Sequence, residues 1–193
     1  MLERYKNNEN SIIGKHEKKI VLECLNSNWI SYTGKYVNQF EKKFEKKMGN
    51  GYAISTCNGT ASLILALNVF NVKKNDEVIV PNFMFAAAIN AVVAVGATPV
   101  ILDVSDDDWL IDENLIKKKL TNKTKAIIVV HSYGIVFDVK KLDFLKKRKK
   151  KIFVIEDAAE ALGSKHNNKQ VGLSGDCSTF SFYPNKNITT GEG

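Results

Sequence analysis

Lys186 is a residue whose type and position could do covalent chemistry. It follows the apolar stretch 180–182, and it is the only lysine after Lys169. A partly buried lysine amine is poorly hydrated and can act as a nucleophile or a base. The alternative is a solvated loop lysine, which is the more common role of this residue type.

Carboxylates follow a second apolar run. Glu156, Asp157 and Glu160 come directly after residues 152–155. A carboxylate at the end of a buried strand is costly unless a cation or a hydrogen-bond donor pairs with it. A protonated ring nitrogen of a cofactor would be such a partner for Asp157. The alternative is that Asp157 caps a helical turn.

A run of small and hydroxyl residues precedes a third apolar segment. Residues 55–60 read Ser-Thr-Cys-Asn-Gly-Thr and open a helix predicted over 60–70. Free backbone N–H groups and the positive dipole end at such a helix N-terminus can bind a phosphate. The alternative is that Asn58 or Thr60 only caps the helix. The run is not a P-loop, and no G-x-G-x-x-G follows any predicted strand.

Aromatic residues follow a fourth apolar run. Phe83 and Phe85 come after residues 77–81 and could offer a flat stacking surface, with core packing as the alternative. A phosphate cradle, a stacking ring, a carboxylate for a pyridinium and an amine that forms a Schiff base are the four parts of a pyridoxal 5′-phosphate (PLP) site. The sequence therefore predicts PLP as cofactor, provided that the fold brings these segments together.

The elements that must position these residues alternate between strands and helices. Strands are predicted over residues 52–55, 77–81, 98–104, 125–131, 152–156 and 179–182. Helices are predicted over 60–70, 83–95, 112–120 and 138–150, after an amphipathic helix that contains Val37, Phe40, Phe44 and Met48. Apolar strands without polar alternation, separated by helices, predict a three-layer α/β fold with a mainly parallel sheet covered on both faces. Ligands in such folds bind beyond the carboxyl ends of the strands, where all four groups above lie. We expect residues 1–30 to form a leading helical arm and 31–193 one domain.

The composition is that of an ordinary folded domain, with 193 residues, 44% hydrophobic and 25% charged. The formal net charge is +7, but six basic residues form the run 146–151, and removing these six leaves only +1. The basicity is therefore local, and we expect no nucleic-acid partner. The run is interpreted as a solvated helix end, with nucleic-acid binding or nuclear targeting as the alternative.

Cysteine and histidine usage predicts neither disulfides nor a metal site. Three cysteines lie far apart in the sequence: Cys24, Cys57 and Cys177. They match no disulfide framework and no C-x-x-C spacing, and the three histidines are equally scattered. The N-terminal residues include no apolar signal segment, and the most apolar stretch, 83–102, is interrupted by Gly96 and Pro99. We therefore expect a cytoplasmic protein that contacts no membrane.

From about Trp29 to the last residue, the chain resembles the DegT/DnrJ/EryC1/StrS family of PLP-dependent sugar-nucleotide aminotransferases. The segments that carry the resemblance are residues 34–37 with 40–41, 58–61, 76–81, 96–100, 156–161 and 181–193. The resemblance implies fold type I, the large domain of aspartate aminotransferase. It also implies that this is an N-terminal portion, without the end of the large domain and without the small C-terminal domain.

The resemblance assigns roles by position. Lys186 would bind the cofactor as a Schiff base and move protons, and Asp157 would keep the pyridine nitrogen protonated. Phe85 would stack on the ring, and Glu160 would lie near the phenolic oxygen. Three residues would hold the phosphate: Gly59, Thr60 and Ser181.

The implied reaction is a two-half transamination. L-glutamate leaves its amino group on the cofactor, and a nucleotide-linked keto-6-deoxy sugar collects it for polysaccharide or glycan biosynthesis, in a homodimeric protein. Residues 188–192 and 29–37 resemble members that aminate C4, the perosamine type, whereas Tyr183 and Pro184 are closer to members acting at C3. Both positions on the sugar therefore stay open.

Two alternatives share the same scaffold. A dehydratase of the family would replace the Schiff-base lysine with histidine, so Lys186 argues against it. An inactive truncated homologue, or a PLP-binding remnant acting as an interaction module, would suit the expected loss of the small domain.

Overall fold

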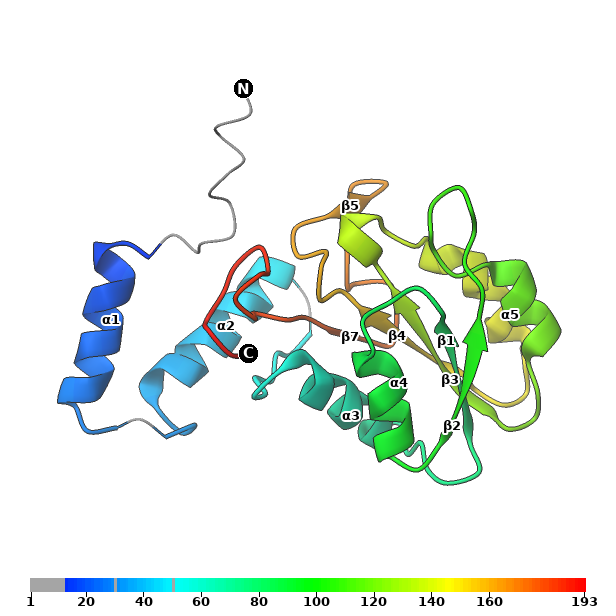
Figure 1. Cartoon of the computed structure of the whole chain (residues 1–193), viewed down its shortest axis with the longest axis horizontal. Helices are drawn as coiled ribbons and strands as arrows, with labels where there is room; N and C mark the ends of the chain where they lie inside the picture. Colours follow the sequence, from blue (N-terminus) through cyan, green and yellow to red (C-terminus); the bar gives the residue numbers. More distant parts are fainter. Residues whose placement is uncertain (1–12, 30, 50) are drawn as a thin grey trace.

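The centre of the molecule is a five-stranded parallel sheet (Figure 1). The computed structural model describes residues 13–29, 31–49 and 51–193. The strand order is β2-β1-β3-β4-β7, and every neighbouring pair is parallel. The strands are β1 (Glu77–Pro81), β2 (Thr98–Leu102), β3 (Thr124–Val130), β4 (Phe153–Asp157) and β7 (Cys177–Thr179). The predicted parallel sheet is confirmed.

Helices cover both faces of this sheet. On one face lie α3 (Gly59–Val69) and α4 (Ala87–Ala94), and on the other lie α5 (Glu113–Lys119) and the 3-10 helix η3 (Val139–Lys147). The remaining helices described are α1 (Lys15–Asn26), α2 (Lys35–Met48) and the short 3-10 helix η2 (Ser132–Gly134). Successive strand residues point to opposite faces. Ile128 accordingly packs with α3 and α4, and its neighbour Ile127 packs with α5 and η3. The predicted three-layer α/β architecture is confirmed.

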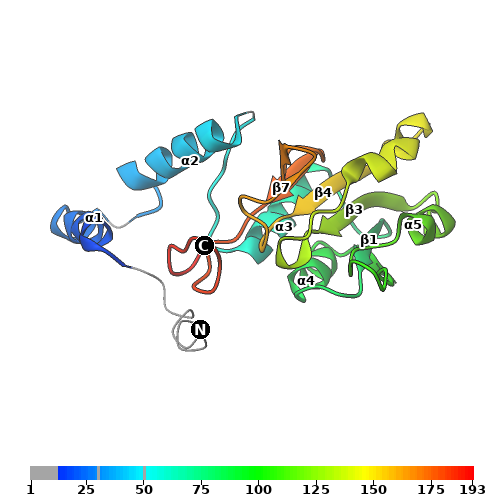
Figure 2. The same ribbon diagram turned by 90° about the horizontal axis from the view of Figure 1, so that it is seen from above.

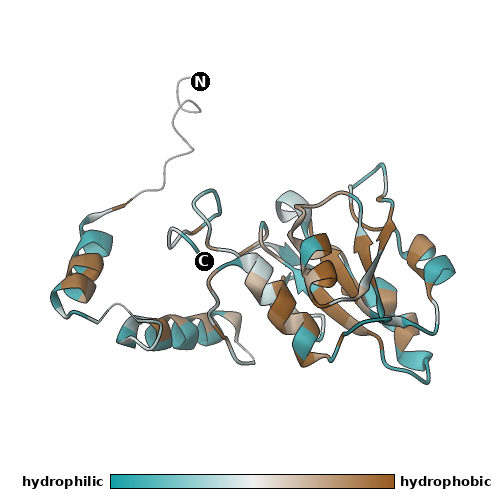
Figure 3. Ribbon diagram, turned by 60° about the horizontal axis from the view of Figure 1, so that its bottom comes forward, coloured by the Kyte–Doolittle hydropathy of each residue, from teal (hydrophilic) through white to brown (hydrophobic). Residues whose placement is uncertain are grey.

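Helices α1 and α2 lie outside the three layers (Figure 1 and Figure 2). Aromatic rings join α2 to the segment after β7. The ring centroids of Phe40 and Phe182 are 5.0 Å apart, and those of Phe44 and Phe180 are 5.1 Å apart. Helix α1 has no buried residue. Figure 3 shows hydrophobic residues concentrated in the strands and α3, while α1 and α2 are mixed. Part of the predicted arm, residues 1–30, lies outside the described residues, and the division into arm and domain stays a prediction.

The predicted strand at residues 52–55 is wrong. This segment has no regular secondary structure and pairs with no strand in the described part of the chain. Its backbone N–H groups at Ala53 and Ser55 donate instead to the carboxylates of Glu45 and Glu41 in α2. Backbone donors of a strand must find acceptors on a neighbouring strand, and here side chains take that place.

Other elements differ in their ends or type. The helix expected over 83–95 begins at Ala87, and that expected over 138–150 is the 3-10 helix η3. The last strand is Cys177–Thr179 rather than 179–182, because its partner β4 ends at Asp157, opposite Thr179. A short hairpin that was not predicted joins β5 (Lys165–His166) to β6 (Lys169–Gln170). Among the described residues, no helix is both long and apolar enough to cross a bilayer.

Candidate functional site

Lys186 and Glu160 meet beyond the carboxyl ends of the strands. Lys186 lies on the segment after β7, Glu160 lies three residues after β4, and Lys186 Nζ is 3.2 Å from Glu160 Oε1. The Lys186 side chain is only 16% exposed. The other carboxylate oxygen, Glu160 Oε2, accepts a hydrogen bond of 3.1 Å from the backbone N–H of Tyr133, just past β3. Three neighbouring strand ends thus contribute to holding this amine.

Asp157 ends β4 as a buried carboxylate with few partners. Its Oδ1 accepts one hydrogen bond, 3.1 Å long, from the backbone N–H of Ala159. Burial raises the pKa of Asp157, while that hydrogen bond and the positive charge of Lys186 act in the opposite direction. Thr179, directly opposite Asp157 in the sheet, has a buried Oγ1 without any hydrogen-bond partner among the described residues. A buried carboxylate and a buried hydroxyl therefore lie side by side and are incompletely bonded.

The N-terminus of α3 faces the segment after β7. Asn58 caps the helix, since its Oδ1 accepts the Ala61 N–H at 2.9 Å. The first two N–H groups, those of Gly59 and Thr60, have no intrahelical acceptor. A Cβ added at Gly59 would lie 3.5 Å from the Cβ of Ser181. The helix N-terminus and the Ser181 hydroxyl thus form the two sides of a site suited to an anion.

Phe85 stands apart from the other candidates. It lies on the loop between β1 and α4 and is 80% exposed. No ring contact joins it to another described aromatic side chain, whereas Phe83, two residues earlier, is only partly exposed and packs against Trp109. One of the two predicted aromatics therefore packs within the protein, and the other presents a free ring.

A buried pair beside the site was not anticipated. His131 and Glu156 are both nearly inaccessible, and His131 Nε2 is 3.0 Å from Glu156 Oε2. The Phe137 backbone N–H donates to His131 Nδ1, so that nitrogen carries no proton and Nε2–H is the donor to Glu156. Glu156 also accepts backbone hydrogen bonds from Gly172, Ser174 and Gly175. Two polar residues at the ends of adjacent apolar runs were the signal in the sequence.

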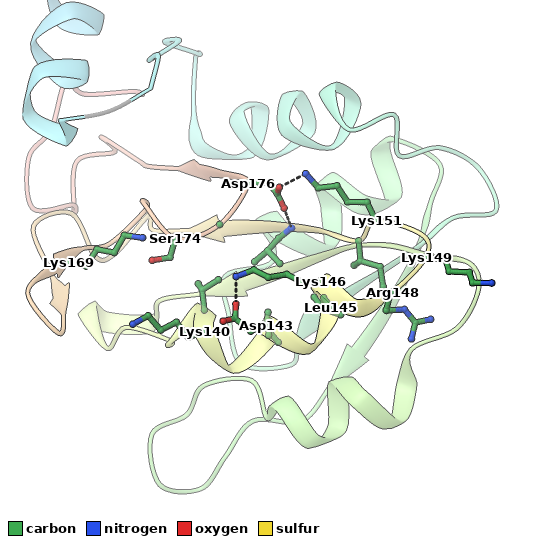
Figure 4. Close-up of a pocket in the computed structure, with 15 residues that line it drawn as sticks. Lys140, Asp143, Leu145, Lys146, Arg148, Lys149, Lys151, Lys169, Ser174 and Asp176 are labelled. Carbon is green, nitrogen blue, oxygen red and sulfur yellow. Dashed lines mark hydrogen bonds and ion pairs between the residues drawn. The ribbon is translucent and has the colours of Figure 1, made fainter.

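A hollow lies elsewhere, beside η3 and the amino ends of β4 and β7 (Figure 4). It contains about 650 Å³ and none of the predicted site residues. Two of its basic residues are paired, Lys146 with Asp143 at 2.6 Å and Lys151 with Asp176 at 2.7 Å. Figure 4 shows Lys149 directed outward, away from these pairs. The basic run is thus divided among ion pairs, a hydrogen bond of 2.8 Å from Lys150 Nζ to the Asn122 carbonyl oxygen, and solvent.

In the part of the chain that the structure describes, no group of three or more His, Cys, Asp or Glu side chains lies close enough together to bind a metal ion. The groups that do converge are an amine, a buried carboxylate, an unpaired hydroxyl and a helix N-terminus. This combination fits PLP, which presents a ring nitrogen, an aldehyde and a phosphate.

Comparisons with known proteins agree with this chemistry. The model of the DegT/DnrJ/EryC1/StrS aminotransferase family matches residues 11–193. GDP-perosamine synthase of Escherichia coli O157:H7 is 48% identical over 183 residues, covering 95% of this chain and 50% of that protein. The dTDP-3-amino-3,6-dideoxy-alpha-D-galactopyranose transaminase of Aneurinibacillus thermoaerophilus is 41% identical over 168 residues, covering 87% and 46%. The chain thus spans about half the length of these relatives.

Solved structures share the fold at similar coverage. A sugar aminotransferase from Streptococcus pneumoniae in its PLP form has a TM-score of 0.90 at 32% identity, covering 95% of this chain and 50% of that one. The Escherichia coli GDP-4-keto-6-deoxy-D-mannose-3-dehydratase has a TM-score of 0.86 at 28% identity, covering 94% and 48%. The fold alone therefore accommodates both amino transfer and dehydration. Because the family model matches nearly the whole of this chain, the chain belongs to the DegT/DnrJ/EryC1/StrS aminotransferase family.

Proposed function

We propose that this chain binds PLP at the carboxyl end of its sheet and forms part of a sugar-nucleotide aminotransferase. The observation that supports this most is the buried, sparsely bonded Asp157 close to the half-buried amine of Lys186. A cationic ring N–H would supply the partner that the buried carboxylate needs. The family membership and the PLP form of the Streptococcus pneumoniae neighbour support the same cofactor.

Each candidate residue has a role that its surroundings suit. Asp157 binds the ring N–H of the cofactor and keeps that nitrogen protonated. Lys186 attaches the cofactor through Nζ and carries protons on the same atom, while Glu160 holds this amine at the edge of the sheet. The phosphate is bound by the N-terminus of α3 and a hydroxyl group, that is, by Gly59, Thr60 and Ser181. Phe85, with its exposed ring, stacks on the cofactor.

PLP, when bound, supplies an electron sink for breaking bonds at the carbon that carries the amino group. The protein residues decide where protons go. Because Asp157 is buried, its negative charge is little screened by water and acts strongly on the ring nitrogen. Glu160 Oε1 lies 3.2 Å from the Lys186 amine and holds it at the same edge of the sheet, which supports proton transfer on Nζ.

The proposed donor is L-glutamate and the proposed acceptor is a nucleotide-linked keto-6-deoxy sugar, aminated at C4, for polysaccharide biosynthesis. The similarity to GDP-perosamine synthases supports this choice. The free cysteines of the chain support a reducing, cytoplasmic location. We include assembly as a homodimer in the proposal, by analogy with the family.

The main alternative is a PLP-binding remnant without transferase activity. In that case the residues of the cofactor site would hold PLP without completing the amino transfer. A dehydratase is disfavoured because Lys186 occupies the position at which those members have histidine.

One experiment separates these functions. The protein is mixed with PLP, and the visible spectrum is recorded for the wild type, Lys186→Ala and the exposed-lysine control Lys169→Ala. We expect a band of covalently bound cofactor in the wild type and the control, and none in Lys186→Ala. No band in the wild type, or equal bands in all three, would contradict the assignment. A spectral change on adding L-glutamate supports the transferase, and its absence supports the remnant.

A further inference from the structure

Three aromatic side chains form a cluster next to the proposed cofactor site without belonging to it. Phe83 packs edge-on against Trp109, with ring centroids 5.0 Å apart, and tilted against Tyr133 at 6.2 Å. Phe83 is partly covered by its neighbours, whereas Trp109 is 53% and Tyr133 74% exposed. We call these three residues the aromatic cluster. Two large rings are thus held in place on a third and left open to solvent.

The aromatic cluster lies on the same edge of the sheet as Lys186. Phe83 follows β1, Trp109 follows β2 and Tyr133 follows β3, all beyond the carboxyl ends of neighbouring strands. The link to the site is direct, because the Tyr133 N–H donates to the same Glu160 carboxylate that holds Lys186. A ligand whose reacting carbon lies at Lys186 and which extends along this edge therefore passes over the cluster.

The spacing of the strands sets the reach of such a ligand. Asp157 ends β4, and three strand intervals separate β4 from β2, whose following loop carries Trp109. At about 4.8 Å per interval this is about 14 Å. A single sugar ring is too short to span that distance, whereas a sugar joined through a diphosphate to a nucleoside is long enough.

The charges around Trp109 indicate which end of the ligand lies there. Three consecutive aspartates, Asp106, Asp107 and Asp108, directly precede it. Their negative charge opposes a phosphate group at this point. A neutral, flat, aromatic group suits an exposed ring next to acidic side chains, and its amino groups can donate to their carboxylates.

We infer that the aromatic cluster binds the base of the nucleotide-linked substrate, by stacking on Trp109 and Tyr133. This inference rests on the proposed function for the nature of the substrate. Stacking on aromatic side chains tolerates any base, because every base has a π-face. The aromatic cluster therefore contributes affinity for the base and not selection among bases.

The chain offers a built-in probe, because it contains only two tryptophans, Trp29 and Trp109. In a Trp29→Phe background the emission comes from Trp109 alone. Cofactor-free protein is titrated with GDP and, separately, with ribose 5-phosphate, which lacks the base. We expect a saturable change in emission with GDP and none with ribose 5-phosphate at equal concentration.

Variants test the cluster without relying on fluorescence. GDP binding is measured by equilibrium dialysis for Trp109→Leu, Tyr133→Leu and the control Tyr32→Leu, which removes an exposed aromatic side chain outside the cluster. We expect binding about tenfold weaker in the first two, the size of one base–aromatic stack, and unchanged in the control. If one cluster variant loses its circular dichroism spectrum, the other decides.

Three results would overturn the inference: no emission change with GDP, equal effects of ribose 5-phosphate and GDP, or wild-type GDP affinity in the folded cluster variants. A Trp109 emission that follows protein concentration instead of GDP would assign the cluster to contacts between copies of the chain, and would also overturn it. The PLP band is recorded on the same samples. A normal band without GDP binding leaves the proposed function standing, and GDP binding without a band leaves only the cluster standing.

Discussion

Replacing Glu156 by glutamine is expected to destabilise the protein strongly, although the two side chains have nearly the same shape. The Glu156 carboxylate is 1% exposed and accepts four hydrogen bonds. Oε2 accepts from His131 Nε2 and the Gly172 N–H, both at 3.0 Å, and Oε1 accepts from the N–H groups of Ser174 and Gly175. All four partners are donors. A glutamine keeps one acceptor oxygen and turns its NH₂ group toward two of them.

The size of the effect follows from this mismatch. Each donor left without an acceptor in a buried position costs about 1–3 kcal/mol. Two such donors would cost about 2–6 kcal/mol, and because the backbone partners are only partly buried we expect about 3 kcal/mol. Against the roughly 5–15 kcal/mol that stabilises a typical domain, the variant stays folded but its unfolding shifts clearly.

The effect of Glu156 also depends on pH with a defined sign. Burial acts to raise the pKa of this carboxyl group, but the hydrogen bonds from His131, Gly175 and Ser174 outweigh it and lower the pKa below its ordinary 4.5. The unfolded chain therefore binds the proton at higher pH than the folded chain does. The stabilisation is complete above pH 4.5 and is lost as the pH falls through the lower folded pKa.

The assay is urea unfolding followed by circular dichroism, at pH 7 and at steps down to pH 3.5. The control is Glu113→Gln. In the wild type the Glu113 carboxylate makes a long ion pair of 3.8 Å with a surface lysine, so this substitution should change the unfolding free energy by less than about 0.5 kcal/mol. We expect the difference in unfolding free energy between the wild type and Glu156→Gln to be largest at pH 7 and to shrink below pH 4.5. A gap under about 1 kcal/mol at pH 7, or one that widens in acid, would refute the reasoning.

Three further substitutions test the site and its frame. Asp157→Asn should raise the melting temperature of the cofactor-free protein at pH 7, because burial raises the pKa of this carboxyl group and its charge therefore opposes folding. The same substitution should weaken PLP binding. The gain in melting temperature should vanish below pH 3.8, and a lower melting temperature at pH 7 would contradict the expectation. Gly59→Ala places a Cβ at an ordinary 3.5 Å from the nearest side chain, so urea unfolding should change by less than about 0.5 kcal/mol while a PLP titration shows about tenfold weaker binding. Gly172→Ala combines a φ of +86° with a Cβ only 2.6 Å from an aromatic ring atom and should lower the free energy of unfolding by about 3 kcal/mol. The control Gly163→Ala, where φ is +94° and no atom lies within 4 Å of the added Cβ, should lower it by about 1 kcal/mol. Equal losses for the two variants in calorimetry would show that crowding plays no part.

The buried strands were predictable because their own residues specify them. Residues 77–81 are a strand with the predicted bounds, and the run expected over 125–131 is β3 shifted by one residue. Residues 52–55 have similar residue types but form no strand, because a strand also needs a neighbour, and α2 supplies the acceptors here. Pairing is a property of two segments, and a pattern within one of them does not contain it.

The candidate site shows the same limit. Lys186 and Glu160 were expected near each other because both follow strands, and their side chains do meet. The pair of His131 and Glu156 was missed because it depends on register: Val129 lies opposite Glu156, which sets the residue after β3 beside that carboxylate. A shift of one residue would have turned Glu156 to the other face.

Glu156 and Asp157 are adjacent carboxylates at the end of one strand, and the fold treats them in opposite ways. The pleat sends them to opposite faces of the sheet. On one face Glu156 receives four hydrogen bonds, and its pKa falls. On the other, Asp157 receives one, lies opposite the unpaired hydroxyl of Thr179, and its pKa rises. A buried charge that receives enough hydrogen bonds from the protein itself stabilises the fold. A buried charge with too few hydrogen-bond donors destabilises the fold, and this difference from Glu156 supports the proposal that Asp157 is the carboxylate that binds the cofactor.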